Sequence, residues 1–356
     1  MEIEERISAF HTLGKYLKEY VGLQTGDFLS QSTEADIFSD LDDAVKQAEI
    51  ENPWFTRENI LIALNSISGS LERPRIEHFI QPYGERLVNQ KPPRTIGVVM
   101  AGNIPVVGFH DFFCILMAGH HFQGKLSSGD FRLLPAIAEI LIRICPEFNT
   151  LVSFTDNRLH DFDSVIATGS NNSYRYFEYY FEKYPHILRK NRNGIAILTG
   201  RETREELSGL ADDIFMFFGK GCRSISKLFL PRGYDFQLFQ EPFSRYSHFF
   251  NHHKYRNNYD YYKTICIIDK IPFIDFGHIL LVERMDITSP VSVLNYEFYD
   301  DLAYVTGKLP GMADQVQCII CHDEKVISSI KPGKAQFPEL WDYADGVDTM
   351  EFLLNL

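Results

Sequence analysis

Apolar residues recur at helical spacing through the first ninety residues of the chain. Positions three or four apart are apolar in Ile3–Leu13, Ile37–Ala48 and Ile60–Ile67, and Thr56 precedes the third stretch as a plausible helix cap. This part of the chain is therefore predicted to be mostly helical. Two consecutive prolines, beginning at Pro92, then mark a break.

From Thr95 onward, short apolar runs alternate with helical patterns. We predict strands at 96–101, 122–126, 150–154, 164–167 and 194–198, and helices at 109–118, 133–144, 174–184 and 203–218. Strands that alternate with helices predict a doubly wound, largely parallel sheet, in which ligands bind at the carboxyl ends of the strands. The pattern is less regular after residue 222, where strands are predicted at 264–268, 279–282, 291–294 and 316–320.

Composition narrows the class of protein. Of the 356 residues, 45% are hydrophobic and 23% are charged, and the formal net charge is −13 with no long acidic block. A chain without a basic face is a poor candidate for nucleic-acid binding. The amino-terminal residues lack a secretory signal pattern, no apolar run approaches the length of a membrane span, and six cysteines in this setting indicate reduced thiols. We expect a cytoplasmic protein.

One cysteine lies in surroundings that favour reactivity. Cys222 follows the apolar end of a predicted helix in the sequence Gly-Lys-Gly-Cys-Arg-Ser, immediately before a predicted strand. Glycines allow close approach of a ligand, and the neighbouring cations Lys220 and Arg223 favour the nucleophilic thiolate. The other five cysteines lie in apolar runs and are expected in the core: Cys114, Cys145, Cys266, Cys318 and Cys321.

Four loops that follow predicted strands carry polar side chains suited to ligand binding. Asn103 could donate to an oxyanion or cap the next helix, and Lys125 with Ser127 suits a ribose or phosphate but also a solvated turn. The segment Thr168-Gly169-Ser170 precedes a predicted helix, so it could bind an anion at the helix amino terminus or only cap the helix. Glu283 places a carboxylate at the end of a predicted strand.

In this order, the loops resemble those of the aldehyde dehydrogenase superfamily, and more narrowly its LuxC-like fatty acyl-CoA reductases. The resemblance covers about residues 90–300 and includes a Gly-x-x-Cys nucleophile motif. The family's motifs are matched by Asn103 and Pro105, Lys125 and Ser127, Thr168, Gly169 and Ser170, Gly219 and Cys222, and Glu283, while Leu126 replaces a family proline.

The resemblance implies an α/β fold with a doubly wound Rossmann-like cofactor domain and a smaller α/β catalytic domain. We expect residues 1–218 to form the helical region and the cofactor domain, 219–336 the catalytic domain, and 337–356 a tail that packs on a partner subunit or closes its own core. The resemblance also assigns the roles of the site residues. Cys222 would be the nucleophile and Asn103 an oxyanion donor, and the remaining residues would bind cofactor: Lys125, Ser127, Thr168, Gly169, Ser170 and Glu283.

A departure from the family pattern suggests the direction of the reaction. Hydrolytic relatives carry a water-activating Glu in a Glu-Leu-Gly-Gly segment, and the segment that we match to it is Ala196–Gly200, with Ile197 in place of that Glu. Loss of this base favours reduction of an acyl thioester, from acyl-CoA or an acyl carrier protein, to an aldehyde. NADPH is the expected cofactor, weakly supported by Lys125, and a homo-oligomer is possible.

Two other functions remain open at this point. An S-acyl transferase would use Cys222 without a nicotinamide, and a scaffold subunit would not need Cys222 at all. His110-Asp111 could be an acid/base pair, although a helix-capping role is favoured. The pairs His120-His121 and His252-His253 lack carboxylate or thiol partners at ligand spacing, so no metal site is predicted.

Overall fold

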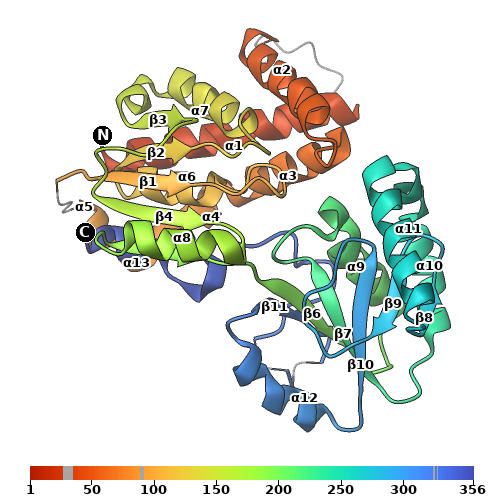
Figure 1. Ribbon diagram of the computed structural model, residues 1–356. Coiled ribbons are helices and arrows are strands. Elements are labelled where there is room, and N and C mark those ends of the chain that lie inside the picture. The colour runs from red at the N-terminus through yellow and green to blue at the C-terminus, as the bar shows by residue number, and fades with distance from the viewer. Residues whose placement is uncertain (27–34, 89–91, 324, 327) are drawn as a thin grey trace. The chain divides into compact units, whose positions relative to one another are not determined.

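The computed structural model describes residues 1–26, 35–88, 92–323, 325–326 and 328–356. These residues form two compact units, shown in Figure 1. Unit 1 comprises Met1–Lys190 and Glu339–Leu356, and unit 2 comprises Asn191–Pro338. The chain therefore leaves unit 1 at Lys190, earlier than the boundary after residue 218 that the sequence suggested. It also returns to unit 1 after unit 2 is complete.

Among the described residues before the sheet of unit 1, five α-helices form, which confirms the prediction that this region is mostly helical. Thr56 caps the third helix, because its hydroxyl accepts a hydrogen bond from the Asn59 amide at 3.3 Å. The first and third helices touch closely, since a Cβ on Gly14 would lie 2.7 Å from the Leu71 Cβ. The helices are α1 (Ile3–Thr25), α2 (Ala35–Glu51), α3 (Arg57–Ser70), α4 (Arg73–Ile80) and α5 (Gly84–Val88).

Unit 1 contains a five-stranded parallel sheet in the order β3-β2-β1-β4-β5. The strand order reverses direction between β1 and β4, as in doubly wound folds. Right-handed crossovers place α6 and α7 on one face and α8 on the other, in front of the sheet in Figure 1. The elements are β1 (Thr95–Val99), α6 (Phe109–Met117), β2 (His121–Lys125), α7 (Leu133–Ile144), β3 (Val152–Thr155), β4 (Ser164–Thr168), α8 (Asn171–Phe181) and β5 (His186–Arg189).

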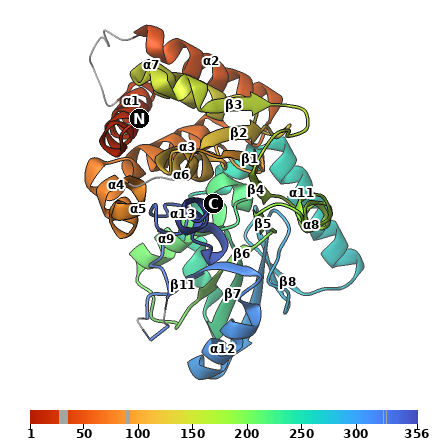
Figure 2. The same cartoon turned by 90° about the vertical axis from the view of Figure 1, so that its left-hand side faces the viewer.

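The segment that follows unit 2 closes the core of unit 1. Helix α13 (Thr349–Leu354) packs on α6, as Figure 2 shows, and buries Met350 and Leu353. The imidazole Nε2 of His120 lies 3.0 Å from the Leu353 carbonyl oxygen. Of the two expectations for this tail, the structure shows packing within its own chain.

Unit 2 is built on a six-stranded sheet in the order β11-β6-β7-β10-β9-β8, in which only β8 is antiparallel to its neighbour. Phe215 of α9 makes edge-to-face ring contacts with Phe243 of α10 and with Phe249, and these contacts join the two helices. The elements are β6 (Asn193–Ile197), α9 (Arg204–Phe215), β7 (Ile225–Pro231), α10 (Gln240–Ser244), α11 (His253–Ile268), β8 (Phe273–Asp275), β9 (Leu280–Glu283), β10 (Val293–Tyr299), α12 (Leu302–Lys308) and β11 (Val316–Ile320).

Two expectations from the sequence are wrong. The predicted strand at 264–268 is the last part of α11, because the tyrosine-rich stretch before it is helical and the β-branched residues continue that helix. Cys145 is partly exposed and donates a hydrogen bond to Glu147 at 3.2 Å, whereas the other four cysteines assigned to the core are buried. Within the described ranges, no helix combines the length and apolarity needed to cross a membrane.

Candidate active site

Three loops of unit 1 begin side by side at the carboxyl ends of β2, β1 and β4. In the parallel register, Val99 of β1 pairs with Lys125 on one side and Ala167 on the other. Neighbouring strands lie about 4.8 Å apart, so the loops that follow them must be adjacent. The structure therefore brings together the segments that carry Asn103, Ser127 and Thr168-Gly169-Ser170.

The loops after β1 and β2 touch through two glycines. A Cβ on Gly129 would lie 2.5 Å from the Gly102 carbonyl oxygen, so neither loop could approach the other so closely with a larger residue there. Asp130 joins them, because its carboxylate accepts hydrogen bonds from the Val106 amide at 2.8 Å and the Leu133 amide at 3.4 Å. Burial raises the pKa of Asp130 to about 6, against the effect of these amides.

The side chains along these loops include a cation, two hydroxyls and an exposed amide. The Lys125 ammonium donates to the Asp156 carbonyl at 3.3 Å, the Ser127 hydroxyl accepts from Gly129 N at 3.1 Å, and Asn103 is exposed. Ser170 caps α8 by accepting from Ser173 N at 3.1 Å, so the helix begins beside this edge. An ammonium, hydroxyls and a helix amino terminus are groups that bind ribose and phosphate.

The turn that carries Cys222 lies in unit 2 and has an unusual backbone. Phe217, Phe218 and Gly219 all have left-handed φ values, 56°, 57° and 70°. Phenylalanine rarely adopts this conformation, and each such residue costs of order 1–3 kcal/mol, which the burial of both rings offsets. The turn then presents Cys222 at an exposed position just before β7.

Hydrogen bonds close the turn around Cys222. The Gly221 amide donates to the Ser224 hydroxyl at 3.1 Å, and the Ser224 amide donates back to the Gly221 carbonyl at 3.0 Å. Two cations flank the thiol in the sequence, and burial, with a smaller effect of Lys254, lowers the pKa of Lys220. The geometry suits an exposed nucleophile in a positively charged loop.

The position of Ile197 corrects one inference from the sequence. Ile197 is buried in β6 and pairs with Phe229, seven residues after Cys222, toward the carboxyl edge of the sheet. The residues beside the Cys222 turn are instead Asn193 and Gly194, since the Gly194 amide donates to the Ser224 carbonyl at 3.0 Å. Ile197 therefore does not occupy the place of a base that would act near Cys222.

Glu283 also lies away from the Cys222 edge. It ends β9, where it pairs with Tyr296, and Tyr296 pairs with Leu228 of β7. The loop after β9 then runs back toward the amino edge, where the Thr288 hydroxyl accepts from Asn193 Nδ2 at 2.9 Å. Asp286, an exposed carboxylate in this loop, therefore lies nearer to the Cys222 edge than Glu283, and the sequence analysis did not select it.

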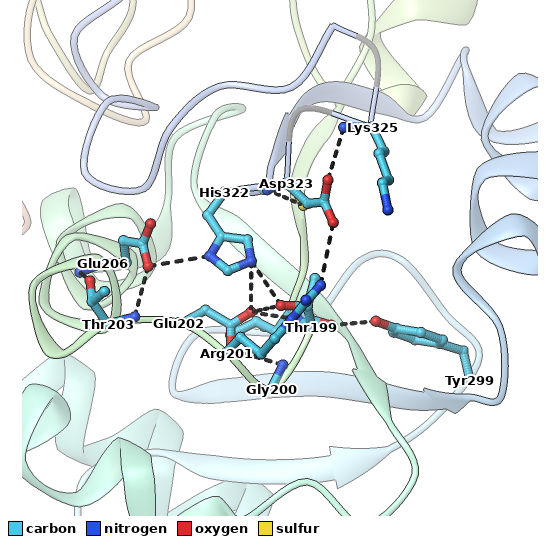
Figure 3. Close-up of polar contacts among 12 residues, drawn as sticks. Thr199, Gly200, Arg201, Glu202, Thr203, Glu206, Tyr299, His322, Asp323 and Lys325 are labelled. Atoms are coloured by element: carbon cyan, nitrogen blue, oxygen red, sulfur yellow. Dashed lines mark hydrogen bonds and ion pairs between the residues drawn. The ribbon is translucent and has the colours of Figure 1, made fainter.

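A polar cluster occupies the opposite, carboxyl edge of the unit 2 sheet (Figure 3). His322 lies between two groups, with its Nε2 2.8 Å from the Thr199 hydroxyl and its Nδ1 3.3 Å from Glu206. The Glu202 carboxylate accepts hydrogen bonds from the Thr199 and Gly200 amides. These groups satisfy one another, and they join the loop after β6 to the end of β11.

His110 and Asp111 have structural roles, but neither caps α6. Asp111 accepts two hydrogen bonds from the Arg189 guanidinium, at 2.6 and 2.9 Å, and both side chains are 7% exposed. Arg189 also donates to the Thr349 hydroxyl at 3.1 Å. His110 Nε2 lies 2.7 Å from the Leu340 carbonyl oxygen, and the cap of α6 is Gly108.

Comparison with solved structures identifies the architecture. Aldehyde dehydrogenase 21 from Physcomitrella patens, solved with succinate, superposes with a TM-score of 0.65 at 11% identity, covering 100% of this chain and 84% of that one. An NADP-dependent enzyme from E. coli gives 0.60 at 13% identity over 92% and 75%. The NAD+ complex of a Bacillus cereus aldehyde dehydrogenase gives 0.59 at 13% identity over 91% and 73%. No protein-family model and no curated protein matches the sequence. The chain therefore has the aldehyde dehydrogenase fold.

Proposed function

We propose that the protein reduces an acyl thioester to the aldehyde, with Cys222 as the nucleophile and NADPH as the reductant. The observation that carries this proposal is the exposed Cys222 at the tip of a strained, positively charged turn. The aldehyde dehydrogenase fold supports it, because two of the similar structures are described with NAD+ or as NADP-dependent.

The reaction begins at the thioester carbonyl. The Cys222 thiolate attacks this carbon, the bond to the CoA or carrier sulfur breaks, and the departing thiolate takes up a proton. Asn103 and the Cys222 amide would hold the developing oxyanion, a contribution of about 2.7–4 kcal/mol per donor in such holes. Addition of two electrons and a proton, as a hydride, to the S-acyl carbon and protonation of the oxygen give a thiohemiacetal. When the hydroxyl proton is lost to solvent and the carbon–sulfur bond breaks, the aldehyde is released and the Cys222 thiolate is restored.

A nicotinamide cofactor would supply the hydride when bound. We assign its adenosine ribose and phosphates to Lys125, Ser127 and the segment Thr168-Gly169-Ser170, which share one edge of the unit 1 sheet. The ammonium of Lys125 would favour a 2′-phosphate and hence NADPH. Glu283 remains a proposal for the nicotinamide ribose, and Asp286 is the alternative that its place in the fold favours.

The strand beside the Cys222 turn, β6, supplies no carboxylate that could activate water there. The two residues of β6 that lie beside this turn are Asn193 and Gly194, and neither can act as a carboxylate base. An S-acyl enzyme that is not attacked by water remains available for hydride transfer.

The test is to follow NADPH absorbance and thiol release together, using purified full-length protein and a series of acyl-CoA thioesters. We expect thioester-dependent NADPH oxidation that Cys222→Ser abolishes and Cys145→Ser, at the other accessible cysteine, preserves. Lys125→Met should raise the KM for NADPH about tenfold, the equivalent of 1.4 kcal/mol, and change that for NADH little.

Three outcomes would contradict the proposal. CoA release that depends on Cys222 but consumes no NADPH would indicate an acyl transferase. NADP+ reduction with aldehydes and free carboxylate as the product would indicate an oxidising dehydrogenase. Equal activity of the wild type and Cys222→Ser would remove the cysteine from the mechanism.

A further inference from the structure

A buried carboxylate in α9 holds a loop from the far end of unit 2. Asp213 is 1% exposed, and its two oxygens accept hydrogen bonds from the Gly333 amide at 2.7 Å and the Ala335 amide at 2.9 Å. The residues are more than 110 positions apart in the chain. Asp213 thus fixes the backbone of the segment Pro332–Gln336, which we call the clamp loop.

Close packing adds to these hydrogen bonds. A Cβ on Gly209, one helical turn before Asp213, would lie 2.8 Å from the Pro332 carbonyl carbon and 2.9 Å from the Gly333 nitrogen. The clamp loop therefore lies directly on the surface of α9. Glycine at 209 is required by this contact, since any side chain would push the loop away.

The other side of the clamp loop contacts the turn that carries Cys222. The Ala335 carbonyl accepts a hydrogen bond from Arg223 Nε at 2.6 Å. The side-chain nitrogen Nε2 of Gln336 donates to the Ser224 hydroxyl at 3.4 Å and to the backbone carbonyl of Asp213 at 3.3 Å. Arg223 and Ser224 are the two residues that follow Cys222, so the clamp loop restrains both.

We propose that Asp213 is a positioning residue for the Cys222 nucleophile and acts through the clamp loop and Arg223. The Asp213 carboxylate accepts a hydrogen bond from the Ala335 amide, and the Ala335 carbonyl accepts one from Arg223. Asp213 is thereby connected to the turn that carries Cys222. This connection holds the side chain of Arg223, the residue that follows Cys222, and limits the conformations of an otherwise strained turn. The inference rests on the proposed role of Cys222 as a nucleophile.

The ionisation of Asp213 should control this restraint. Burial raises the pKa of Asp213 to about 7, with a smaller contribution from Asp212, against the effects of the Gly333 and Ala335 amides and of Arg223. The ionised carboxylate accepts from both amides. A neutral carboxyl group has one oxygen that carries a proton, so one of the two amides loses its acceptor. The clamp loop should be held firmly above pH 7 and loosely below it.

The experiment measures alkylation of Cys222 by iodoacetamide as a function of pH, with mass spectrometry of the peptide that contains it. It needs neither substrate nor cofactor, so it separates this inference from the proposed reduction. Asp213→Asn is nearly isosteric and imitates the neutral form. We expect the wild-type and Asp213→Asn rate constants to agree at pH 6 and the wild type to be roughly three- to tenfold faster at pH 8.5, because the variant holds the cation less well.

Two further variants keep the inference testable. Gly209→Ala displaces the clamp loop without changing any charge, is favourable in a helix interior, and should slow alkylation in the same way. Asp275→Asn alters a carboxylate that accepts from the Gly277 amide at 2.7 Å at the far edge of the same sheet, and it should leave alkylation unchanged. A wild-type to Asp213→Asn ratio that stays constant with pH, or an equal effect of Asp275→Asn, would overturn the assignment.

Discussion

Two carboxylates, Asp130 and Asp213, each accept hydrogen bonds from two backbone amides. Both amides bonded to Asp213 belong to the clamp loop, whereas Asp130 accepts from Val106 in the loop after β1 and from Leu133 at the start of α7. One joins the loops proposed to bind cofactor, and the other restrains the nucleophile turn. A sequence can show that Asp213 is a charged residue in an apolar helical stretch, but its partners are more than 110 residues away. The exposed Cys222 and the ligand-type loops were visible because they depend on local patterns of glycine, cation and hydroxyl.

Asp286 and Glu283 provide a direct comparison at this scale. If the loop after β9 supplies the carboxylate for the nicotinamide ribose, Asp286→Asn should lower kcat/KM for NADPH roughly 10- to 100-fold, the effect of losing a charged hydrogen bond of about 1.5–3 kcal/mol. Glu283→Gln should change it less than twofold. Steady-state kinetics of both variants test this, and the reverse ranking would restore Glu283 to the role.

At the scale of elements, the sequence predicted the strands and helices of the unit 1 sheet to within a few residues, apart from β5. The sequence could not show whether two residues lie at the same edge of a sheet or at opposite edges. The family pattern put Ile197 at the position of a base that acts beside the nucleophile Cys222, yet parallel pairing places Ile197 beside Phe229. The prediction of a strand at 264–268 was wrong because a short run of β-branched residues can also form the end of a helix that begins earlier in the chain.

Arg189 joins three elements of unit 1 and gives a prediction at this scale. It ends β5 and contacts Asp111 of α6 and Thr349 of α13. Arg189→Met leaves the Asp111 carboxylate buried without its partner, so we expect a loss of about 3–5 kcal/mol in the free energy of unfolding. Urea denaturation of the wild type and the variant measures this difference in the free energy of unfolding.

The control for that experiment is Arg94→Met. Arg94 forms an ion pair with Asp163 at 3.4 Å in which both side chains are about half exposed. Exposed pairs contribute at most about 1 kcal/mol, so this variant should unfold close to the wild type. If both variants lost the same free energy of unfolding, the buried Arg189–Asp111 pair would contribute no more to stability than an exposed pair.

At the scale of the whole molecule, unit 2 is an insertion in unit 1. No shift in composition and no flexible linker marks the passage at Lys190, which is why the sequence suggested a later boundary. Unit 2 has its own sheet and its own buried clusters. Unit 1 depends on residues that come from both sides of the insertion.

Separate fragments test this organisation. Residues 191–338 should fold alone and unfold cooperatively when followed by circular dichroism. Residues 1–190 should be less stable than unit 1 in the full chain by several kcal/mol, because they lack the buried Met350 and Leu353, each worth about 1.5–3 kcal/mol. An unfolding midpoint of 1–190 that matches the full chain would contradict the dependence on the returning segment.

The returning segment also sets an order of events during synthesis. At about 5–20 residues per second, the ribosome takes roughly seven to thirty seconds to make unit 2 after Lys190 has been added. Throughout this interval, Arg189 and His120 have not yet met the partners that α13 supplies, and the face of α6 that it covers stays bare. A nascent chain arrested inside unit 2 would therefore display an apolar surface to chaperones and proteases.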